Sequence, residues 1–331
     1  MKNFKKFLAV ALVAVLAVSF AACSGGSKGA AVKTGLAVIG SIEDVKDTTL
    51  TIDVVAAAVT VDADGKIVDV KIDEAQTKPD LAKADEDYGV DLRTKYEKQG
   101  DYAMKETSAQ IGAIEGGGEW FEQADAFMAW AKGKTAAEVR AAVGDDGKPT
   151  DADLKAGCTI TVSTIAETVA RAVDNAADLG ATADDKLALN IKTEKYYESD
   201  GVKLLQYDSN VAAVTTNADG KITSCLIDAA QGKGTMADGK FTVKEGTITS
   251  KKDLKEDYNM KGVSASIGVI PNGGEWYEQA AAYENWAKDK TADQIKAAVG
   301  EDGKSTDADL TAGCTITISS IAETVANAAQ A

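Results

Sequence analysis

The chain has no histidine, only three prolines and only four cysteines in 331 residues. Without histidine it cannot build a Ser–His–Asp triad, a histidine-ligated haem or a histidine-containing zinc site. The cysteines are not spaced as chelating pairs, which argues against a zinc knuckle or an iron–sulfur cluster. We therefore expect no metal site and no disulfide. These cysteines are Cys23, Cys158, Cys225 and Cys314.

Basic residues are also in short supply, since 36 Lys and Arg face 52 Asp and Glu, giving a net charge of −16. A surface of this sign repels phosphate backbones, so nucleic acid is not an expected partner.

The N-terminus has the features of a lipoprotein signal. Three lysines precede an apolar run over 7–20, and Ala21 and Ala22 stand before Cys23. We predict a signal peptide over 1–22, lipidation of Cys23 and a flexible tether over 23–36, which places the protein on the extracellular face of the cell membrane. The alternative is an ordinary signal peptide with an incidental cysteine. Removing 1–22 takes away three lysines and no acids, so the net charge becomes −19.

The rest of the chain is duplicated. Asp-Ala-Asp-Leu-Xaa-Ala-Gly-Cys-Thr-Ile-Thr occurs at 151–161 and 307–317, and Gly-Gly-Glu-Trp at 117–120 and 273–276, both 156 residues apart. A unit of about 140 residues is long enough to bury its own core. We predict two homologous domains in tandem, 37–175 and 187–331, joined by a linker over 176–186.

Each domain is expected to be α+β. Alternating apolar residues around an Ala-Asp-Gly turn predict an antiparallel hairpin over 50–72, repeated over 211–227. Apolar residues at helical spacing predict helices over 119–132 and 275–288. Shorter helices are expected after the capping boxes that begin at Thr135 and Thr291. We read 157–161 and 313–317 as strands, each followed by a helix capped by Thr164 with Glu167 or Ser320 with Glu323.

The repeated Gly-Cys-Thr phrase admits two interpretations. Glycine lets a ligand approach the backbone, and the threonine hydroxyl next to a helix N-terminus suits an anion such as phosphate. The other interpretation is a strand with a small residue at a tight packing point. Cys225, within an apolar strand, is most simply a core residue.

This phrase resembles the flavinylation signature of FMN-binding domains, which reads Asp, two variable residues, Ser or Thr, Gly, Ala, Thr. The match covers Asp153, Gly157, Cys158 and Thr159, and again Asp309, Gly313, Cys314 and Thr315. Ala156 and Ala312 replace the Ser or Thr, and the two cysteines replace the Ala. In that family a flavin transferase joins FMN through its phosphate to the final threonine, so the resemblance implies two covalent FMN groups, on Thr159 and Thr315.

The repeated residues outside the signature are candidates for the flavin pocket, although each also has a structural interpretation. Trp and Met pack in cores, Lys is commonly solvated, and Gln can end a strand. The candidates are Asp73, Gln76, Tyr102, Met104, Lys105, Glu119, Trp120 and Gln123 in the first domain, and Asp228, Gln231, Tyr258, Met260, Lys261, Glu275, Trp276 and Gln279 in the second.

The order of these segments resembles that of secreted FMN-binding lipoproteins of Gram-positive extracellular electron transfer. The resemblance implies an electron carrier that takes electrons from a membrane NADH dehydrogenase through quinone and delivers them to extracellular acceptors such as ferric iron. A covalent link would also prevent loss of the flavin outside the cell. The alternatives are a flavinylated subunit that feeds a separate reductase of the fumarate reductase kind, and a surface lipoprotein without flavin.

Overall fold

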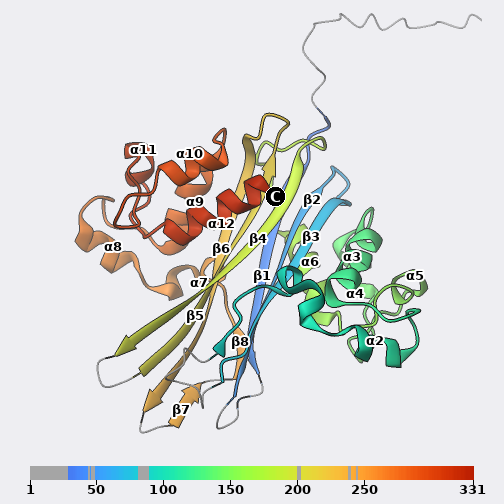
Figure 1. The fold of residues 1–331 in the computed structure, drawn as a ribbon. Coiled ribbons are helices and arrows are strands. Elements are labelled where there is room, and N and C mark those ends of the chain that lie inside the picture. The colour runs from blue at the N-terminus through green and yellow to red at the C-terminus, as the bar shows by residue number, and fades with distance from the viewer. Residues whose placement is uncertain are drawn as a thin grey trace, which may run out of the picture.

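The computed structural model describes residues 29–331 except 44, 46–48, 81–88, 200–202, 238–239 and 244. Over this part of the chain the fold is mixed α and β, with two four-stranded antiparallel sheets. The strand order is β3-β2-β1-β8 in one sheet and β4-β5-β6-β7 in the other. Helices lie outside both sheets, so that the strands form the middle of the molecule (Figure 1).

The first sheet is built on the expected hairpin. β1 (Lys33–Glu43) pairs with β2 (Thr51–Val61), and β2 pairs with β3 (Ile67–Thr77) across a tight turn. In the turn the carboxylate of Asp62 accepts the backbone NH groups of Asp64 and Lys66, both at 2.9 Å. Gly65 follows at φ +75°, a conformation that favours glycine. The predicted hairpin is confirmed, and β3 runs on to Thr77.

The second sheet repeats this arrangement with longer strands. β4 (Lys186–Ser199) pairs with β5 (Lys203–Thr216), and β5 pairs with β6 (Ile222–Ala237), which pairs with the short β7 (Lys240–Val243). The remaining strand, β8 (Gly246–Ile248), leaves its own half and pairs with residues 40–42 of β1. It thereby covers an edge that would otherwise expose unpaired backbone groups.

The helices follow in the same order in both halves. Those of the first half are α1 (Lys95–Lys98), η2 (Gln99–Tyr102), α2 (Lys105–Ile111), α3 (Trp120–Ala131), α4 (Ala136–Ala141), α5 (Ala152–Lys155) and α6 (Ser163–Asp174). Those of the second are α7 (Lys251–Leu254), η3 (Lys255–Tyr258), α8 (Lys261–Ile267), α9 (Trp276–Ala287), α10 (Ala292–Ala297), α11 (Ala308–Thr311) and α12 (Ser319–Gln330). The helices expected at 119–132 and 275–288, and the capping boxes at Thr135 and Thr291, are confirmed.

Two expectations about the repeated phrase are wrong. Residues 157–161 and 313–317 form no strand; each is an extended loop between two helices. The helix that follows begins at Ser163 or Ser319, and no side chain caps its first turn. Glu167 is not available as a capping partner because it is paired with Arg140 at 2.8 Å and with Arg171 at 3.0 Å.

The two sheets pack face to face, and this divides the core into layers. β1 faces β6 and β3 faces β4. β4 is the second-half counterpart of β1, and β6 is the counterpart of β3. The two contacts are therefore related by exchange of the halves, which gives the interface the pseudo-twofold symmetry of a symmetric dimer. Small apolar side chains fill the space between the sheets, among them Val54, Ala56 and Ala213. A buried hydrogen bond of 2.9 Å between the hydroxyls of Thr34 and Ser224 also joins the halves.

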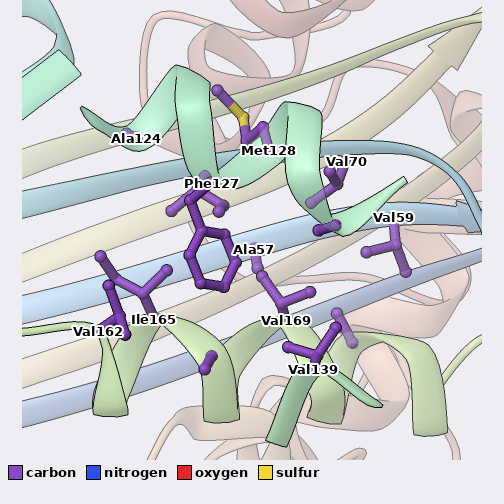
Figure 2. Packing of buried hydrophobic residues seen from close by; sticks show 14 of the residues in the cluster. Ala57, Val59, Val70, Ala124, Phe127, Met128, Val139, Val162, Ile165 and Val169 are labelled. Atoms are coloured by element: carbon purple, nitrogen blue, oxygen red, sulfur yellow. The ribbon is translucent and has the colours of Figure 1, made fainter. Parts of the chain in front are cut away.

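The outer face of each sheet carries a separate helix-covered core. Figure 2 shows Phe127 of α3 reaching over Ala57 of β2 toward Ile165 and Val169 of α6. The second half repeats this core with Tyr283 in place of Phe127. Cys225 is buried there, as expected.

The expected boundaries can be compared with the strands. The signal peptide and Cys23 lie outside the described residues. β1 begins at Lys33, so the last residues of the expected tether 23–36 belong to the sheet. The expected linker 176–186 connects α6 to β4, and within it Ala177 and Thr182 form bridges to Thr34 and Ala31. Among the described residues, no helix is both long and apolar enough to cross a membrane.

Candidate functional site

A cavity of about 430 Å³ lies between the outer face of the first sheet and its helices. Strand residues Asp53, Val55 and Glu74 form its floor, and the walls come from helix starts and loops. The wall residues include Lys95, Tyr102, Met104, Trp120, Lys148, Thr159, Thr161 and Thr164. The cavity thus brings together Tyr102, Met104, Trp120 and Thr159, which the sequence singled out separately.

The hydroxyl of Thr159 is fixed by a buried glutamine of α3. Thr159 donates both its backbone NH and its Oγ1 hydroxyl to Oε1 of Gln123, at 2.8 and 3.0 Å. The amide nitrogen of Gln123 donates to the carbonyl of Gly118 at 2.9 Å, which fixes which end of the amide is the acceptor. Gln123 therefore lies behind the cavity wall and holds the threonine in one orientation.

The surroundings of Thr159 suit an anion. The ammonium group of Lys148 donates to the carbonyl of Thr159 at 3.1 Å, and both residues line the cavity. Thr164, also in the lining, lies in the first turn of α6, where no side chain caps the helix. Uncapped NH groups at a helix N-terminus attract negative charge. A phosphate on the Thr159 hydroxyl would face a lysine and a helix N-terminus together.

A buried lysine lies among aromatic rings deeper in the cavity. Lys95, the first residue of α1, forms an ion pair of 2.6 Å with Glu74. Its Nζ also lies 5.0 Å from the centre of the Tyr102 ring and 5.7 Å from that of Trp120. Burial is the largest single effect and favours the neutral lysine, but the Glu74 carboxylate and the Tyr102 hydroxyl together outweigh it and raise the pKa of Lys95. Burial in turn raises the pKa of Glu74 to about 7.

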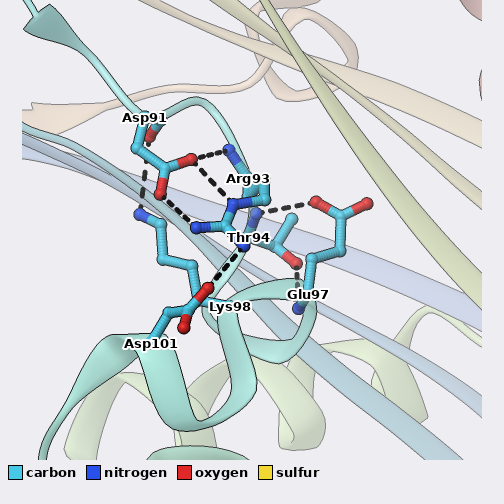
Figure 3. Close-up of polar contacts among 6 residues, drawn as sticks. All are labelled: Asp91, Arg93, Thr94, Glu97, Lys98 and Asp101. Carbon is cyan, nitrogen blue, oxygen red and sulfur yellow. Dashed lines mark hydrogen bonds and ion pairs between the residues drawn. The ribbon is translucent and has the colours of Figure 1, made fainter.

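Polar contacts fix α1 and therefore Lys95. The carboxylate of Asp73 accepts the backbone NH groups of Glu74 at 2.7 Å and Tyr96 at 3.2 Å. Burial raises its pKa to about 7. Thr94 and Glu97 form the capping box of α1, while Arg93 bridges Asp91 and Asp101 in front of it (Figure 3). Asp73, a pocket candidate, thus holds the helix that carries the lysine.

Gln76 also acts from behind the cavity wall. Its amide nitrogen donates to Asp53 at 2.9 Å, and its amide oxygen accepts from the Tyr102 hydroxyl at 3.3 Å. It orients two lining residues and is not itself part of the lining.

The second half contains a matching cavity of about 360 Å³. Its lining includes Lys251, Tyr258, Met260, Trp276, Lys304, Thr315, Thr317 and Ser320, each 156 residues after its counterpart. Thr315 donates its NH and hydroxyl to Oε1 of Gln279 at 2.8 and 3.1 Å. Gln231 donates to Asp208 at 2.7 Å, as Gln76 does to Asp53.

The second cavity differs from the first in the charge beside its lysine. Position 229 is alanine where the first half has Glu74. Among the described residues, the carboxylate oxygen nearest to Lys251 is that of Asp208 at 4.0 Å. Burial lowers the pKa of Lys251, with Asp208 and Asp228 opposing the change. Burial also raises the pKa of Asp228, whose carboxylate accepts the backbone NH of Lys252 in α7, to about 6.

Several candidates lie outside the cavity lining. Glu119 and Glu275 accept the NH groups of Met104 and Met260, both at 2.9 Å, and so join two helix starts. Lys105 and Lys261 are exposed at the surface, so they do not supply the cavity's positive charge. The remaining candidates outside the lining belong to the signature: Asp153, Gly157, Cys158, Asp309, Gly313 and Cys314.

These signature residues shape the loop instead. Asp153 and Asp309 are exposed. Cys158 and Cys314 point into the two cores, and burial raises the pKa of each thiol to about 11, which keeps the sulfur protonated at neutral pH. A side chain at Gly157 would meet the Cβ of Ala126 at 2.7 Å, so glycine is needed where the loop crosses α3.

The buried lysines are the main residues that sequence reasoning missed. Lys95 lies outside every helix and strand that the sequence predicted. A signal was present, because Lys95 and Lys251 keep the 156-residue offset and each follows a Thr or Ser capping residue. Lys148 and Lys304 share that offset as well.

The described residues contain no group of three or more Cys, Asp or Glu side chains arranged to hold a metal ion. No protein-family model, no curated protein and no solved structure matches this chain.

Proposed function

We propose that this chain is an electron carrier made of two FMN-binding domains, with FMN joined through its phosphate to Thr159 and to Thr315. One observation carries the proposal: each half has a cavity in which a threonine hydroxyl, an uncapped helix N-terminus, two aromatic side chains and a buried lysine meet.

The residues present fit this group. Volumes of about 430 and 360 Å³ fall within the range of small-molecule sites. The phosphate would attach where Lys148 or Lys304 lies beside the helix N-terminus. Trp120 with Tyr102, and Trp276 with Tyr258, provide aromatic walls for a flat ring. When bound, FMN supplies one- and two-electron chemistry at that ring.

The protein's own contribution is positioning and electrostatics. The hydroxyls of Thr159 and Thr315 donate to the Oε1 atoms of Gln123 and Gln279, so each hydroxyl oxygen has one orientation before it is modified. Lys251 places a positive charge beside the aromatic walls, and Lys95 does the same where Glu74 offsets it. In a buried site such a charge favours a bound group that becomes more negative on reduction.

The cellular setting is part of the proposal. Lipidation of Cys23 would hold the protein on the extracellular face of the membrane, and a flavin transferase would attach both FMN groups. A membrane NADH dehydrogenase would supply electrons through quinone, and ferric iron or another extracellular acceptor would receive them.

The test is the mass of the intact protein after coexpression with a flavin transferase. We expect a yellow colour that survives denaturation and the added mass of two FMN phosphoesters. Thr159→Ala and Thr315→Ala should each remove one, and the double variant both. A colourless chain of unmodified mass would overturn the proposal in favour of a surface lipoprotein without flavin.

A test of electron transfer follows. The reduced protein should be reoxidised by ferric iron without oxygen. Reoxidation only after addition of a separate reductase would favour the subunit alternative.

A further inference from the structure

The floors of the two cavities differ by one buried carboxylate. Glu74 of β3 lies 2.6 Å from Lys95, with only 10% of its side chain exposed. The equivalent position in β6 is Ala229, which is fully buried. The strand pairing confirms the equivalence, since Glu74 lies opposite Val55 as Ala229 lies opposite Asn210.

The other charged residues that line the two cavities are matched, apart from Glu43. Beside the second cavity Glu194 accepts a hydrogen bond from Ser320, but this carboxylate is partly exposed and is paired with Lys192. Asp53 corresponds to Asp208, and both accept a hydrogen bond from a glutamine. The cavity lysines correspond as well, Lys95 to Lys251 and Lys148 to Lys304. Glu43, which also lines the first cavity, is exposed at the end of β1 and is screened by water. The first cavity is therefore the more negative of the two.

From this difference we infer that the two cavities hold the same redox group at different reduction potentials, with the Thr315 cavity the higher, so that electrons collect in the second half. The inference rests on the proposed function. A group that gains electrons becomes more negative, and a neighbouring carboxylate opposes that gain. The exchange needs no co-reactant, because the group in the first half loses as many electrons as the group in the second half takes up.

The size of the effect is estimated from Coulomb's law. A single charge a few ångströms away in a buried site changes an equilibrium by at least about tenfold. The ion pair is part of that change. Glu74 cancels the positive charge of Lys95 in the first cavity, whereas among the described residues the counterpart Lys251 in the second cavity has no such partner within 4 Å other than Asp208. A tenfold preference corresponds to about 30 mV for a two-electron couple.

The experiment is a redox titration of the full-length chain, coexpressed with a flavin transferase and followed by visible absorbance at a pH above the Glu74 pKa of about 7. Thr315→Ala leaves only the first site loaded, and Thr159→Ala leaves only the second. We expect the second site to be reduced at the higher potential, by at least about tenfold in the equilibrium constant.

Substitutions at Glu74 and Ala229 test whether this carboxylate causes the difference in potential. In the Thr315→Ala background, Glu74→Ala and the isosteric Glu74→Gln should both raise the potential of the first site. Asp64→Ala is the matched control, since it removes an exposed carboxylate at the far end of the same hairpin, and it should leave the potential unchanged. In the Thr159→Ala background, Ala229→Glu should lower the potential of the second site if the variant folds, as judged by circular dichroism.

The outcomes separate the two claims. Absence of flavin from both halves would overturn the proposed function. Flavin on both halves with equal potentials, with the reverse order, or with no response to either Glu74 variant would overturn the inference and leave the electron carrier standing.

Discussion

Replacing Gln123 by leucine tests how the threonine hydroxyl is held. Gln123 is fully buried and accepts two hydrogen bonds from Thr159. Its amide nitrogen donates to the carbonyl of Gly118 and to the hydroxyl of Ser108. Leucine has a similar size but no polar atom. The variant therefore leaves the NH of Thr159 and the carbonyl of Gly118 without these partners, while the hydroxyl can turn toward the cavity.

The cost can be estimated from those two groups. Each buried polar group left without a partner costs about 1–3 kcal/mol, so the free energy of unfolding should fall by about 2–6 kcal/mol. Urea denaturation followed by tryptophan fluorescence measures this fall. Gln279→Leu is the matched variant, because Gln279 makes the same contacts, at 2.8 and 3.1 Å with Thr315, 2.9 Å with Gly274 and 3.4 Å with Ser264.

Modification should respond in only one half. With a flavin transferase present, Gln123→Leu should reduce the FMN on peptides containing Thr159 and leave those containing Thr315 unchanged, and Gln279→Leu should do the reverse. Each protein thus carries its own control. The reasoning is refuted if the loss of stability stays below about 0.5 kcal/mol, as for an ordinary surface substitution, and both threonines remain fully modified.

Three further predictions concern stability. Tyr283→Phe should raise the free energy of unfolding by about 1 kcal/mol, measured by urea denaturation, because among the described residues the buried Tyr283 hydroxyl has no hydrogen-bond partner. Asp73 has its pKa raised from 3.8 to about 7 by burial, so its contribution to stability is fully present below pH 3.8 and is lost as the pH rises through 7. Thermal melts should therefore show a shallower decline between pH 5 and pH 7 for Asp73→Asn than for the parent, and identical slopes would contradict this. Gly157→Val should cost about 1–3 kcal/mol through overpacking against Ala126. Gly100→Ala, at a position with open space around it, is its control in the same denaturation assay.

The elements that could be predicted from the sequence are those whose pattern is local. The hairpin turn at Asp62 and the capping box at Thr135 rest on contacts between residues at most four positions apart, and both form as expected. Residues 157–161 misled the same reasoning. Cys158, Ile160 and Val162 alternate with more exposed residues, as in a strand, but they anchor an extended loop to the core with no neighbouring strand.

The stacking of the sheets depends on contacts between residues far apart in the chain. The sequence of β2 nevertheless indicated that this strand is buried on both faces. Its run of Val54, Val55, Ala56, Ala57 and Ala58 is apolar at every position, which is typical of a strand buried on both faces. The sequence alone does not say what covers the second face. In the structure the odd-numbered residues of this run face the helices, and the even-numbered ones face the other sheet.

Duplication within one chain explains how the two sites can differ. A symmetric dimer of identical subunits packed in this way would have two identical cavities, because every substitution would occur twice. Joining the halves in one chain keeps the sheet-to-sheet packing and lets each cavity vary alone. The differences indeed occur within a common framework: Glu74 becomes Ala229 and Val55 becomes Asn210, while the threonine, its glutamine and the cavity lysines stay in place. The proposed relay between two copies of one cofactor would use this combination, because residues that bind the cofactor are shared while residues that set its potential differ.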